Sequence, residues 1–556
     1  MILDTLHYVY GLDTSCFNTP EEMAVERKMM QARNLHTQIR ERIKSGKYKE
    51  PHAKTLKFLT ERAGYYKDTL KQMYEDHKAL VRTVRPEVLT IRRQISIFDS
   101  VLTRCFGLKE RQLNEEIVVI QVYFYGIAES LIRNGFYMNG NKYIFFSASA
   151  GQIRTKKFVA VREDLLNENW NRLTAGLTIA KINELGGFNV NKFLSYLSLC
   201  NSATREWKDF DIDRAIVVDD FENKVTCQVD YIDEKDYSIT RQTMDVPITH
   251  TDGCGMMLPE ISKRNFMARL PFVKGLLVSF DFRKFIKDNN CIPIIKDVYG
   301  QEHNIIEENI QIIFCKSQFK LWKLWPSWKQ YQEDFKSNNC QAGICNDEEI
   351  FIPHSKINYQ MLQTLYDMSD DELKTIAADT VNQINALCTD VTSMLRAFGA
   401  AELAKCKNGF QRSLNIYPEL LSDSYSRETL KDIKNNLENE LYSGRLKLDC
   451  KYSFVVPDLY AACEYWFLHI NDPKGLLQNG EVSCRLYKSG IELDCLRSPH
   501  LYIEHAIQNN VVNRTTKEWF TTDAVYASCH SPISKILQFD GQHCRTLWKH
   551  SELKLG

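Results

Sequence analysis

The sequence lacks several features that would assign it to a protein class at once. Lysine and arginine total 71, and aspartate and glutamate also total 71, so no net charge draws a polyanion to the whole surface. The 24 glycines and 14 prolines are too few for a collagen-like or low-complexity chain, and 44% hydrophobic residues are too many for a disordered one. Any nucleic-acid or nucleotide site must therefore be a local basic region.

Two further absences concern the compartment and the membrane. The 17 cysteines do not have the dense, regular spacing of a disulfide-stabilised secreted protein, and no basic segment followed by an apolar one opens the chain. The most apolar stretch, residues 117–132, is interrupted by Gln121 and Glu129 and is too short to span a bilayer. We therefore expect a cytoplasmic protein with mostly free thiols, no membrane partner, and a buried element at this stretch.

The pattern of residues predicts a multi-domain protein of the α+β class, because 556 residues suffice for two to four domains. Residues 20 to about 135 read as helical. Short runs of Val, Ile, Tyr and Thr between Asp, Asn, Gly and Lys clusters predict strands over residues 211–314, and helical spacing of apolar residues returns at 358–441. The expected regions are a mainly helical N-terminal region (1–205), a β-rich unit (206–350), a helical connector (351–448) and a second β-rich unit (449–556).

A basic stretch lies in the predicted N-terminal helices, with eight Lys or Arg between Arg27 and Lys49. Glu26, Glu41 and Glu50 are interleaved with them, which favours a solvated helix face. The alternative is one wall of a nucleic-acid channel.

The first segment that could carry chemistry is Asp-Gly-Cys-Gly at residues 252–255. Two glycines beside an aspartate allow a tight turn that a ligand can approach, although an ordinary hairpin turn has the same pattern. Arg269 and Lys274 follow, five residues apart, and such a pair of cations can neutralise phosphate.

The second segment spans residues 316–329, where Trp322, Trp325 and Trp328 are interleaved with four lysines. This composition suits a surface that stacks bases and neutralises a nucleic-acid backbone. Tryptophans three residues apart also suit a core stripe with lysines that reach the solvent, and the sequence leaves both readings open.

Three weaker signals follow. Cys340 and Cys345, near His354, lack the second ligand pair of a zinc site. Residues 494–505 combine an arginine and two histidines around a proline, which suits anion recognition as well as a loop of satisfied polar groups. Asp540 ends a strand-like run before Gly541, as do carboxylates that hold Mg²⁺, but it is the one carboxylate there.

Taken in order, these segments resemble the cellular RNA-dependent RNA polymerase family, the silencing type found in eukaryotes with relatives in bacteria and phages, and most closely its bacterial members. The similarity covers roughly residues 210–540. The matching segments are residues 252–255 with 274–275, 316–320, 358–363, 476–482, 497–500 and 533–540.

The resemblance implies two double-psi β-barrels joined by helices and facing each other across the active site. It implies that Lys274, and less securely Lys296, face the triphosphate or the transcript, and that Arg497 lies near the sugar of the incoming nucleotide, where a 2′-hydroxyl contact favours ribonucleotides. The remaining residues predicted to bind nucleotide or nucleic acid are Arg269, from the first segment above, and Lys316, Gln318, Lys320 and His500, from the matching segments.

The chain departs from the family at the metal-binding loop, which in the family reads Asp-x-Asp-Gly-Asp. Asp540 is either its first aspartate, followed by Gln542, His543 and Cys544, or its middle one, flanked by Gln538 and Gln542. Both alignments lose two of three carboxylates, so Mg²⁺ affinity should fall steeply. Since the similarity stops at Asp540, we expect residues 541–556 to be foreign to the family and the second barrel to be truncated.

The leading hypothesis is an RNA polymerase that copies a nucleic-acid template into an RNA product from ribonucleoside triphosphates, by a two-metal mechanism with Mg²⁺, inactive or incomplete in this chain. One alternative is a nucleotide- or nucleic-acid-binding protein without activity. Another is a split subunit whose missing carboxylates come from a second polypeptide. The sequence leaves open whether the template is RNA or DNA.

Overall fold

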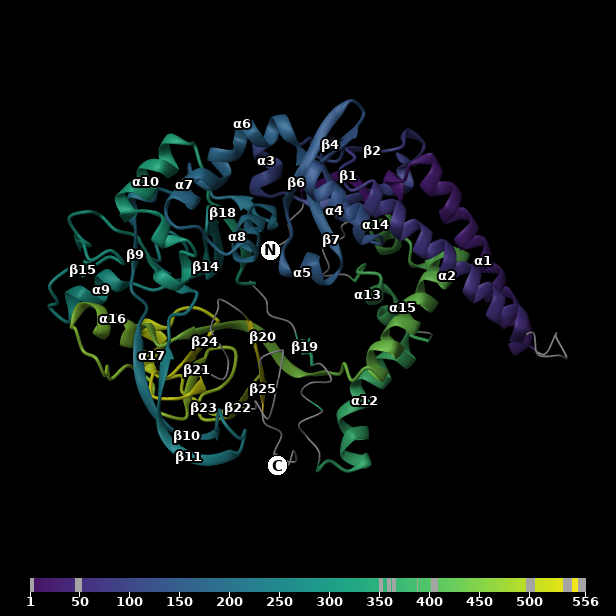
Figure 1. Cartoon of the computed structure of the whole chain (residues 1–556). Coiled ribbons are helices and arrows are strands. Elements are labelled where there is room, and N and C mark those ends of the chain that lie inside the picture. Colours follow the sequence, from purple (N-terminus) through teal and green to yellow (C-terminus); the bar gives the residue numbers. More distant parts are fainter. Residues whose placement is uncertain are drawn as a thin grey trace. The chain divides into compact units, whose positions relative to one another are not determined.

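The computed structural model describes residues 5–45, 53–349, 354–357, 362, 367–387, 389–401, 409–496, 506–533 and 543–548 (Figure 1). The chain divides into two compact units. Unit 1 comprises Met1–Ile212, Ala268–Lys274 and Lys320–Asn346, and unit 2 comprises Asp213–Met267, Gly275–Phe319 and Asp347–Gly556. The boundary between the units falls within two successive strands, β13 (Phe266–Leu270) and β14 (Val273–Ser279).

Unit 1 is built on a seven-stranded mixed sheet with the strand order β2-β5-β6-β7-β4-β1-β3. The sheet corrects the prediction that residues 20 to about 135 are helical: the prediction is wrong at β2, β3 and β4, whereas α3 and α4 in the same range are helices. Ile117, Val118 and Ile120 are buried in β4, because consecutive β-branched side chains pack on both faces of a covered sheet. The strands are β1 (Leu6–Asp13), β2 (Arg82–Thr83), β3 (Gln94–Phe98), β4 (Leu113–Gln121), β5 (Phe136–Met138), β6 (Asn141–Ser147) and β7 (Lys157–Arg162).

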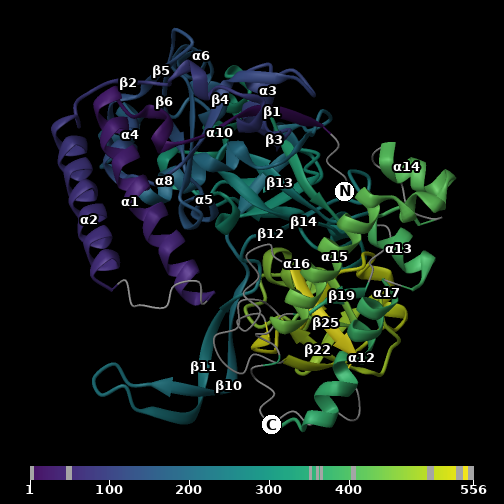
Figure 2. The ribbon, with the colours of Figure 1, turned by 90° about the vertical axis from the view of Figure 1, so that its right-hand side faces the viewer.

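Two long helices, α1 (Pro20–Lys44) and α2 (Ala53–Asp76), form a helical hairpin in unit 1 (Figure 2). Thr19 caps α1: its side chain accepts from the N–H of Glu22, whose carboxylate accepts from the N–H of Thr19. The other helices and strands of this unit are α3 (Val101–Cys105), α4 (Tyr125–Asn134), α5 (Ala150–Arg154), α6 (Glu163–Thr174), α7 (Ile179–Glu184), α8 (Val190–Leu197), α10 (Trp328–Ser337), β8 (Arg205–Glu206) and β18 (Gly343–Asp347).

The first part of unit 2 is β-rich, as the sequence predicts. The fully buried strands β9 (Ala215–Val218), β12 (Cys254–Met257) and β17 (Ile312–Cys315) pair in the order β12-β17-β9, and the end of β14 pairs in parallel with β12. Two further pairs of strands, β10 (Glu222–Ile232) with β11 (Ile239–Thr249) and β15 (Ile294–Lys296) with β16 (Glu302–Asn304), form separate two-stranded sheets. The helix α9 (Phe282–Asp288) follows β14.

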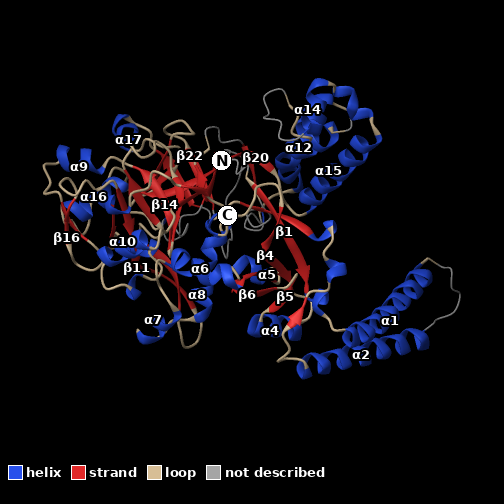
Figure 3. Cartoon of the chain, turned by 90° about the horizontal axis from the view of Figure 1, so that it is seen from above, coloured by secondary structure: helices blue, strands red, loops and turns tan. Residues whose placement is uncertain are grey.

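The connector of unit 2 is helical, in agreement with the sequence. Figure 3 shows α12, α14 and α15 grouped together. The helices are α12 (Asp370–Ala386), α13 (Val391–Ala397), α14 (Gly409–Ile416) and α15 (Ser424–Tyr442).

Strands return after the connector, in a seven-stranded sheet with the order β19-β20-β24-β21-β23-β22-β25. Two helices, α16 (Leu459–Phe467) and α17 (Arg514–Trp519), accompany it. The strands are β19 (His354–Lys356), β20 (Lys447–Pro457), β21 (Glu481–Cys484), β22 (Glu492–Leu496), β23 (Ala506–Asn510), β24 (Val525–Ala527) and β25 (His543–Trp548). The whole is a mixed α and β protein. Among the described helices, none is long and apolar enough to cross a membrane.

Candidate functional site

The turn at Asp252-Gly253 is held by hydrogen bonds that lead, through Ser317, to a half-buried carboxylate, that of Asp220. The N–H of Gly253 donates to Ser317 Oγ (2.8 Å), and Ser317 in turn donates through Oγ (2.6 Å) and its N–H (2.9 Å) to the carboxylate of Asp220. Thr251 Oγ1 donates to the same carboxylate (3.2 Å). Gly253 has a φ of 70°, so the tight, φ-positive turn predicted from the glycines is confirmed.

The side chain of Gln318 leaves no room for a Cβ at Gly275, on a strand beside this turn. This side chain is fully buried, its Nε2 donates to the carbonyls of Gly253 (3.3 Å) and Leu276 (3.0 Å), and its Oε1 accepts from the N–H of Cys315 (2.9 Å). A Cβ on Gly275 would lie 2.6 Å from the carbonyl oxygen of Gly253 and 2.7 Å from Cδ of Gln318, which no real contact allows. The Gln318 amide therefore joins β12, β14 and the end of β17 and positions the backbone around the turn.

The pKa of Asp220, beside this turn, is perturbed. Burial raises its pKa to about 6, the hydrogen bonds from Ser317 and Thr251 oppose that rise, and the nearby charge of Asp252 adds to it. A carboxylate already bound by two side chains and partly protonated near neutral pH is a poor ligand for a metal ion. Its role in the structure is to position Ser317.

Three of the predicted cations, all in unit 1, lie next to a second turn, the one between β13 and β14. Phe272 has a φ of 59°, its carbonyl accepts from the N–H of Lys320 (2.9 Å), and the carbonyl of Pro271 accepts from the hydroxyl of Tyr331 (2.7 Å). Two half-buried cations, Lys274 on β14 and Lys320 beside Phe272, therefore have a fixed backbone. The third, Arg269 on β13, is buried and its Nη1 donates to the carbonyl of Ala268 (2.8 Å).

The tryptophan-rich segment packs against this turn through Trp325. Trp325 and Trp328 are buried, Trp325 packs against Phe272 with ring centroids 6.1 Å apart, and Trp328 stacks on Tyr331 at 5.0 Å. Of the two readings that the sequence left open, the core reading is correct for these two residues. Trp322 is half-buried.

The other predicted binding residues are distributed as follows. Lys316, in unit 2, pairs with Asp219 at 2.8 Å, and Lys296, on the short strand β15, is exposed and 3.7 Å from Glu302. Arg497, His500 and Asp540 lie outside the described residues.

Asp458 is an organising residue that the sequence reading missed. Its fully buried carboxylate caps α16 by accepting from the N–H groups of Tyr460 and Ala461 (3.1 Å each), and it also accepts from Leu476 (2.6 Å) and Leu477 (3.2 Å). It thereby fixes the loop before β21, one of the segments that carry the family resemblance. An Asp directly before an apolar helix is a capping signal that could have revealed it.

The two β-rich parts of unit 2 share a buried polar network around Glu348. Its carboxylate accepts from the N–H groups of Asn265 (3.2 Å) and Asp523 (2.7 Å), and Asn265 donates to Thr522 Oγ1 (2.8 Å). Burial raises the pKa of Glu348 to about 7. Asn223 forms a second link, between His250 Nε2 (2.8 Å) and the carbonyl of Cys529 (3.0 Å).

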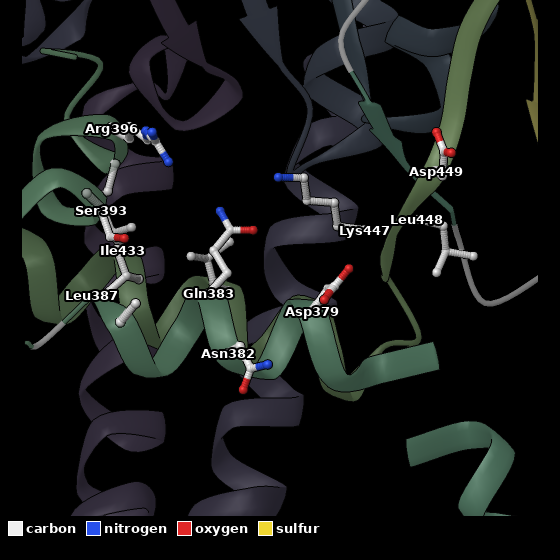
Figure 4. Close-up of a pocket in the computed structure, with 13 residues that line it drawn as sticks. Asp379, Asn382, Gln383, Leu387, Ser393, Arg396, Ile433, Lys447, Leu448 and Asp449 are labelled. Atoms are coloured by element: carbon white, nitrogen blue, oxygen red, sulfur yellow. The ribbon is translucent and has the colours of Figure 1, made fainter. Parts of the chain in front are cut away.

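A separate cavity of about 830 Å³ lies among the connector helices α12, α13 and α15 and the start of β20. Figure 4 shows Gln383 and Lys447 extending into the same space, with Arg396 on one side and Asp379 below. Both signs of charge line it, and its lining contains none of the residues singled out in the sequence. Within the described part of the chain, no group of three or more His, Cys, Asp or Glu side chains could hold a metal ion, so the zinc reading of Cys340 and Cys345 gains no support.

Comparison with known proteins gives two matches. Residues 82–268 match the model of a family described as RNA dependent RNA polymerase. The chain is also 45% identical over 547 residues to the DNA-directed RNA polymerase YonO of Bacillus phage SPbeta. Both matches are to RNA polymerases, so the chain is similar to proteins of this class. The alignment with the phage protein covers 98% of this chain and 64% of the relative, so the chain spans about two thirds of the relative's length.

The predicted relationship to RNA polymerases is thus confirmed at this level. The family match begins at Arg82, whereas the resemblance recognised from the sequence motifs begins near residue 210. Most strands of the unit 1 sheet therefore lie within the matched region, together with the turn at Asp252-Gly253.

Proposed function

We propose that this chain takes part in template-directed RNA synthesis and that its template is DNA. The observation that carries the proposal is the 45% identity, along 98% of the chain, to a phage protein named as a DNA-directed RNA polymerase. The family model is named for RNA as template, so RNA is the second candidate. Similarity over this length leaves little of the chain to serve an unrelated purpose.

We propose that the backbone-fixed cations bind phosphate. Lys274 and Lys320 extend from a turn held by Phe272 and Tyr331, and Lys316 directly precedes the serine that holds the Asp252-Gly253 turn. Because the backbone is already fixed, only the lysine side chains have to be ordered when they meet a triphosphate or a nucleic-acid backbone. Arg269 is buried, and its role in this proposal is to support β13.

Four further assignments stay proposals that rest on the sequence. Arg497 would contact the sugar of the nucleotide, and His500 would contact an anion. Lys296, which is exposed, would face the triphosphate or the transcript together with Lys274. The seven-stranded sheet after the connector and the β-rich part before it would correspond to the two barrels of the family. A cytoplasmic location likewise stays a prediction.

The residues around Asp540 do not fit a Mg²⁺ site. An amide at Gln542, an imidazole at His543 and a thiol at Cys544 supply no carboxylate, and Mg²⁺ requires several hard oxygen ligands. Asp220 does not replace them, because its carboxylate is bound by Ser317 and Thr251. We therefore propose that this chain binds template and nucleotide and that extension requires carboxylates from a second polypeptide.

Primer extension combined with binding measurements tests the proposal. The chain is incubated with a labelled primer on a DNA or an RNA template, ribonucleoside triphosphates and Mg²⁺, and binding of the same fluorescent primer–template is followed by anisotropy. We expect the chain to bind the primer–template without extending the primer, and to bind a DNA template more tightly than an RNA template. Lys274→Ala should weaken binding several-fold. Lys431→Ala, which changes an exposed lysine on α15, should leave binding unchanged.

Each outcome of these assays has a meaning. Extension by the chain alone would overturn the inference about the metal site and support the polymerase. Equal binding by Lys274→Ala and the unchanged chain would overturn the phosphate-binding role of the β13–β14 turn. Absence of both binding and extension on either template would refute the proposed function.

A further inference from the structure

The helical hairpin of unit 1 carries a row of aromatic side chains that the proposed site does not use. On α2, Phe58 is 56% exposed and Tyr65 is 68% exposed. The guanidinium of Arg62 lies 5.9 Å from the ring centroid of Phe58 and 5.9 Å from that of Tyr66, whose ring contacts that of Tyr65 edge-on at 5.5 Å. Arg62 therefore bridges two rings in a continuous aromatic row, which we call the α2 ladder.

Positive charge predominates in the part of the hairpin sequence that contains the α2 ladder. Over residues 33–45 and 53–67 the sequence has eight lysines and arginines against two glutamates. Several of these cations are exposed, namely Arg33, Arg40 and Lys44 on α1 and Lys54, Lys57 and Lys67 on α2. One of the two glutamates, Glu61, lies 4.0 Å from Lys57 in an exposed pair that neutralises little. The interpretation of the basic stretch as a solvated helix face depended on glutamates between the cations. Residues 33–45 and 53–67 contain two glutamates against eight cations, which weakens that interpretation.

The base of the hairpin is rigid. Arg82 donates to both carboxylate oxygens of Glu22 (2.7 and 3.0 Å), both side chains are fully buried, and His77 Nδ1 contacts the same carboxylate (2.8 Å). Met29 and Leu70 are buried in the main core of unit 1, and Tyr66 packs against it. The ladder thus stands on a fixed support, although Phe58 and Tyr65 contribute almost nothing to the core.

We propose that the α2 ladder and its flanking cations bind single-stranded nucleic acid. Bases stack on exposed aromatic rings irrespective of sequence, an arginine between rings adds a cation–π contact, and neighbouring lysines and arginines neutralise phosphates. A solvated helix needs no exposed Phe58 and Tyr65, and the excess of cations favours a polyanion over an ordinary protein surface. This surface is distinct from the β13–β14 turn, and its binding requires no catalysis by the chain.

The test measures binding of a fluorescent single-stranded oligonucleotide, as RNA and as DNA, to the full chain by anisotropy. We expect Phe58→Ala, Arg62→Ala and Tyr65→Ala each to weaken binding on the order of 10-fold, because each removes a stacking contact. Tyr237→Ala is the matched control, since Tyr237 is 76% exposed and lies between β10 and β11 beside four carboxylates within seven residues. It should bind like the unchanged chain.

Two further measurements separate stacking from other causes. Tyr65→Phe keeps the ring and should retain binding, whereas Arg40→Ala should weaken binding and flatten its dependence on salt concentration. Circular dichroism of each variant should show an unchanged melting curve, because the altered side chains are exposed.

Binding by the alanine variants equal to that of the unchanged chain would overturn the proposal. The stacking mechanism would be overturned if Tyr65→Phe lost as much binding affinity as Tyr65→Ala. It would also be overturned if the alanine variants lost as much affinity for a fully paired duplex as for the single strand. If Lys274→Ala loses primer–template binding while the ladder variants bind normally, the ladder is refuted and the proposed function stands. If only the ladder variants lose binding, the ladder is supported and the phosphate-binding role of the β13–β14 turn fails.

Discussion

Gly275→Ala tests whether the buried amide of Gln318 is the reason for a glycine at this position. The new Cβ would overlap the Gln318 amide and approach the carbonyl oxygen of Gly253 to 2.6 Å. To make room, either β14 must move away from β12 or the Gln318 side chain must leave its place. In the second case it gives up its hydrogen bonds to Gly253, Leu276 and Cys315.

The expected cost follows from these contacts. Overpacking a tight interior costs about 1–3 kcal/mol, and each buried backbone group left without a partner costs about 1–3 kcal/mol. Together they predict a loss of about 4 kcal/mol for Gly275→Ala, which corresponds to a fall of roughly 8 °C in the thermal midpoint. Gln318→Ala should cost about as much, since it leaves the same three backbone groups unpaired. In the double variant the new methyl group occupies the vacated space, so the combined loss should be about 3 kcal/mol smaller than the sum.

Thermal unfolding is followed by tryptophan fluorescence, because Trp466 and Trp519 are buried in unit 2. Midpoints are compared among the variants, since a chain of two units need not unfold in one step. Gly409→Ala is the control within unit 2: it lies in α14 with nothing within 4 Å of its Cβ position, so it should raise or preserve stability. If Gly275→Ala unfolds within about 1 °C of the unchanged chain, or if the two changes are additive, Gln318 does not impose the glycine.

Three further predictions concern buried charges. Because the pKa of Glu348 is about 7 in the folded chain, its contribution to stability is complete below about pH 4.5 and falls by about 3 kcal/mol as pH rises to 7; Glu348→Gln should remove this slope in thermal midpoints from pH 5 to 8. Burial lowers the pKa of His250 to about 3, so its contribution should fall by about 2 kcal/mol from pH 6.5 to 5, and a His250→Gln curve of the same acid slope would contradict this. Glu22→Gln leaves Arg82 buried without its charge partner and should cost about 3–5 kcal/mol in urea unfolding, whereas Glu21→Gln, at the exposed neighbouring position, should leave the urea midpoint unchanged.

Local patterns predicted much of the fold. Runs of β-branched residues between turn residues identified the strands of unit 2, and helical spacing identified the connector. The same reasoning failed for residues 82–121, where β2, β3 and β4 interrupt a region that is rich in charged residues. Their pairing partners, such as β7 for β4, lie about 40 residues away along the chain, and local periodicity carries no information on such pairing.

Candidate residues were predicted by type better than by role. Lys274 and Lys320 were recognised as cations, but only the structure connects them through the carbonyl of Phe272. Gln318 was expected to bind a ligand, whereas its amide is fully used by backbone groups. Asp458 was not recognised at all, since two of its four hydrogen-bond donors come from a loop 18 and 19 residues away.

The sequence by itself determined the class of the protein: an α+β chain without net charge, whose motifs resemble those of RNA polymerases. It also determined that carboxylates are scarce around Asp540, because ligand chemistry depends on residue type. Only the tertiary structure decided that Trp325 and Trp328 are core, that Gln318 holds three backbone segments together, and that Phe58 and Tyr65 are exposed beside Arg62. The physical reason is that burial and hydrogen-bond partners depend on segments distant along the chain, so the same residue type serves a core, a backbone contact or a binding surface.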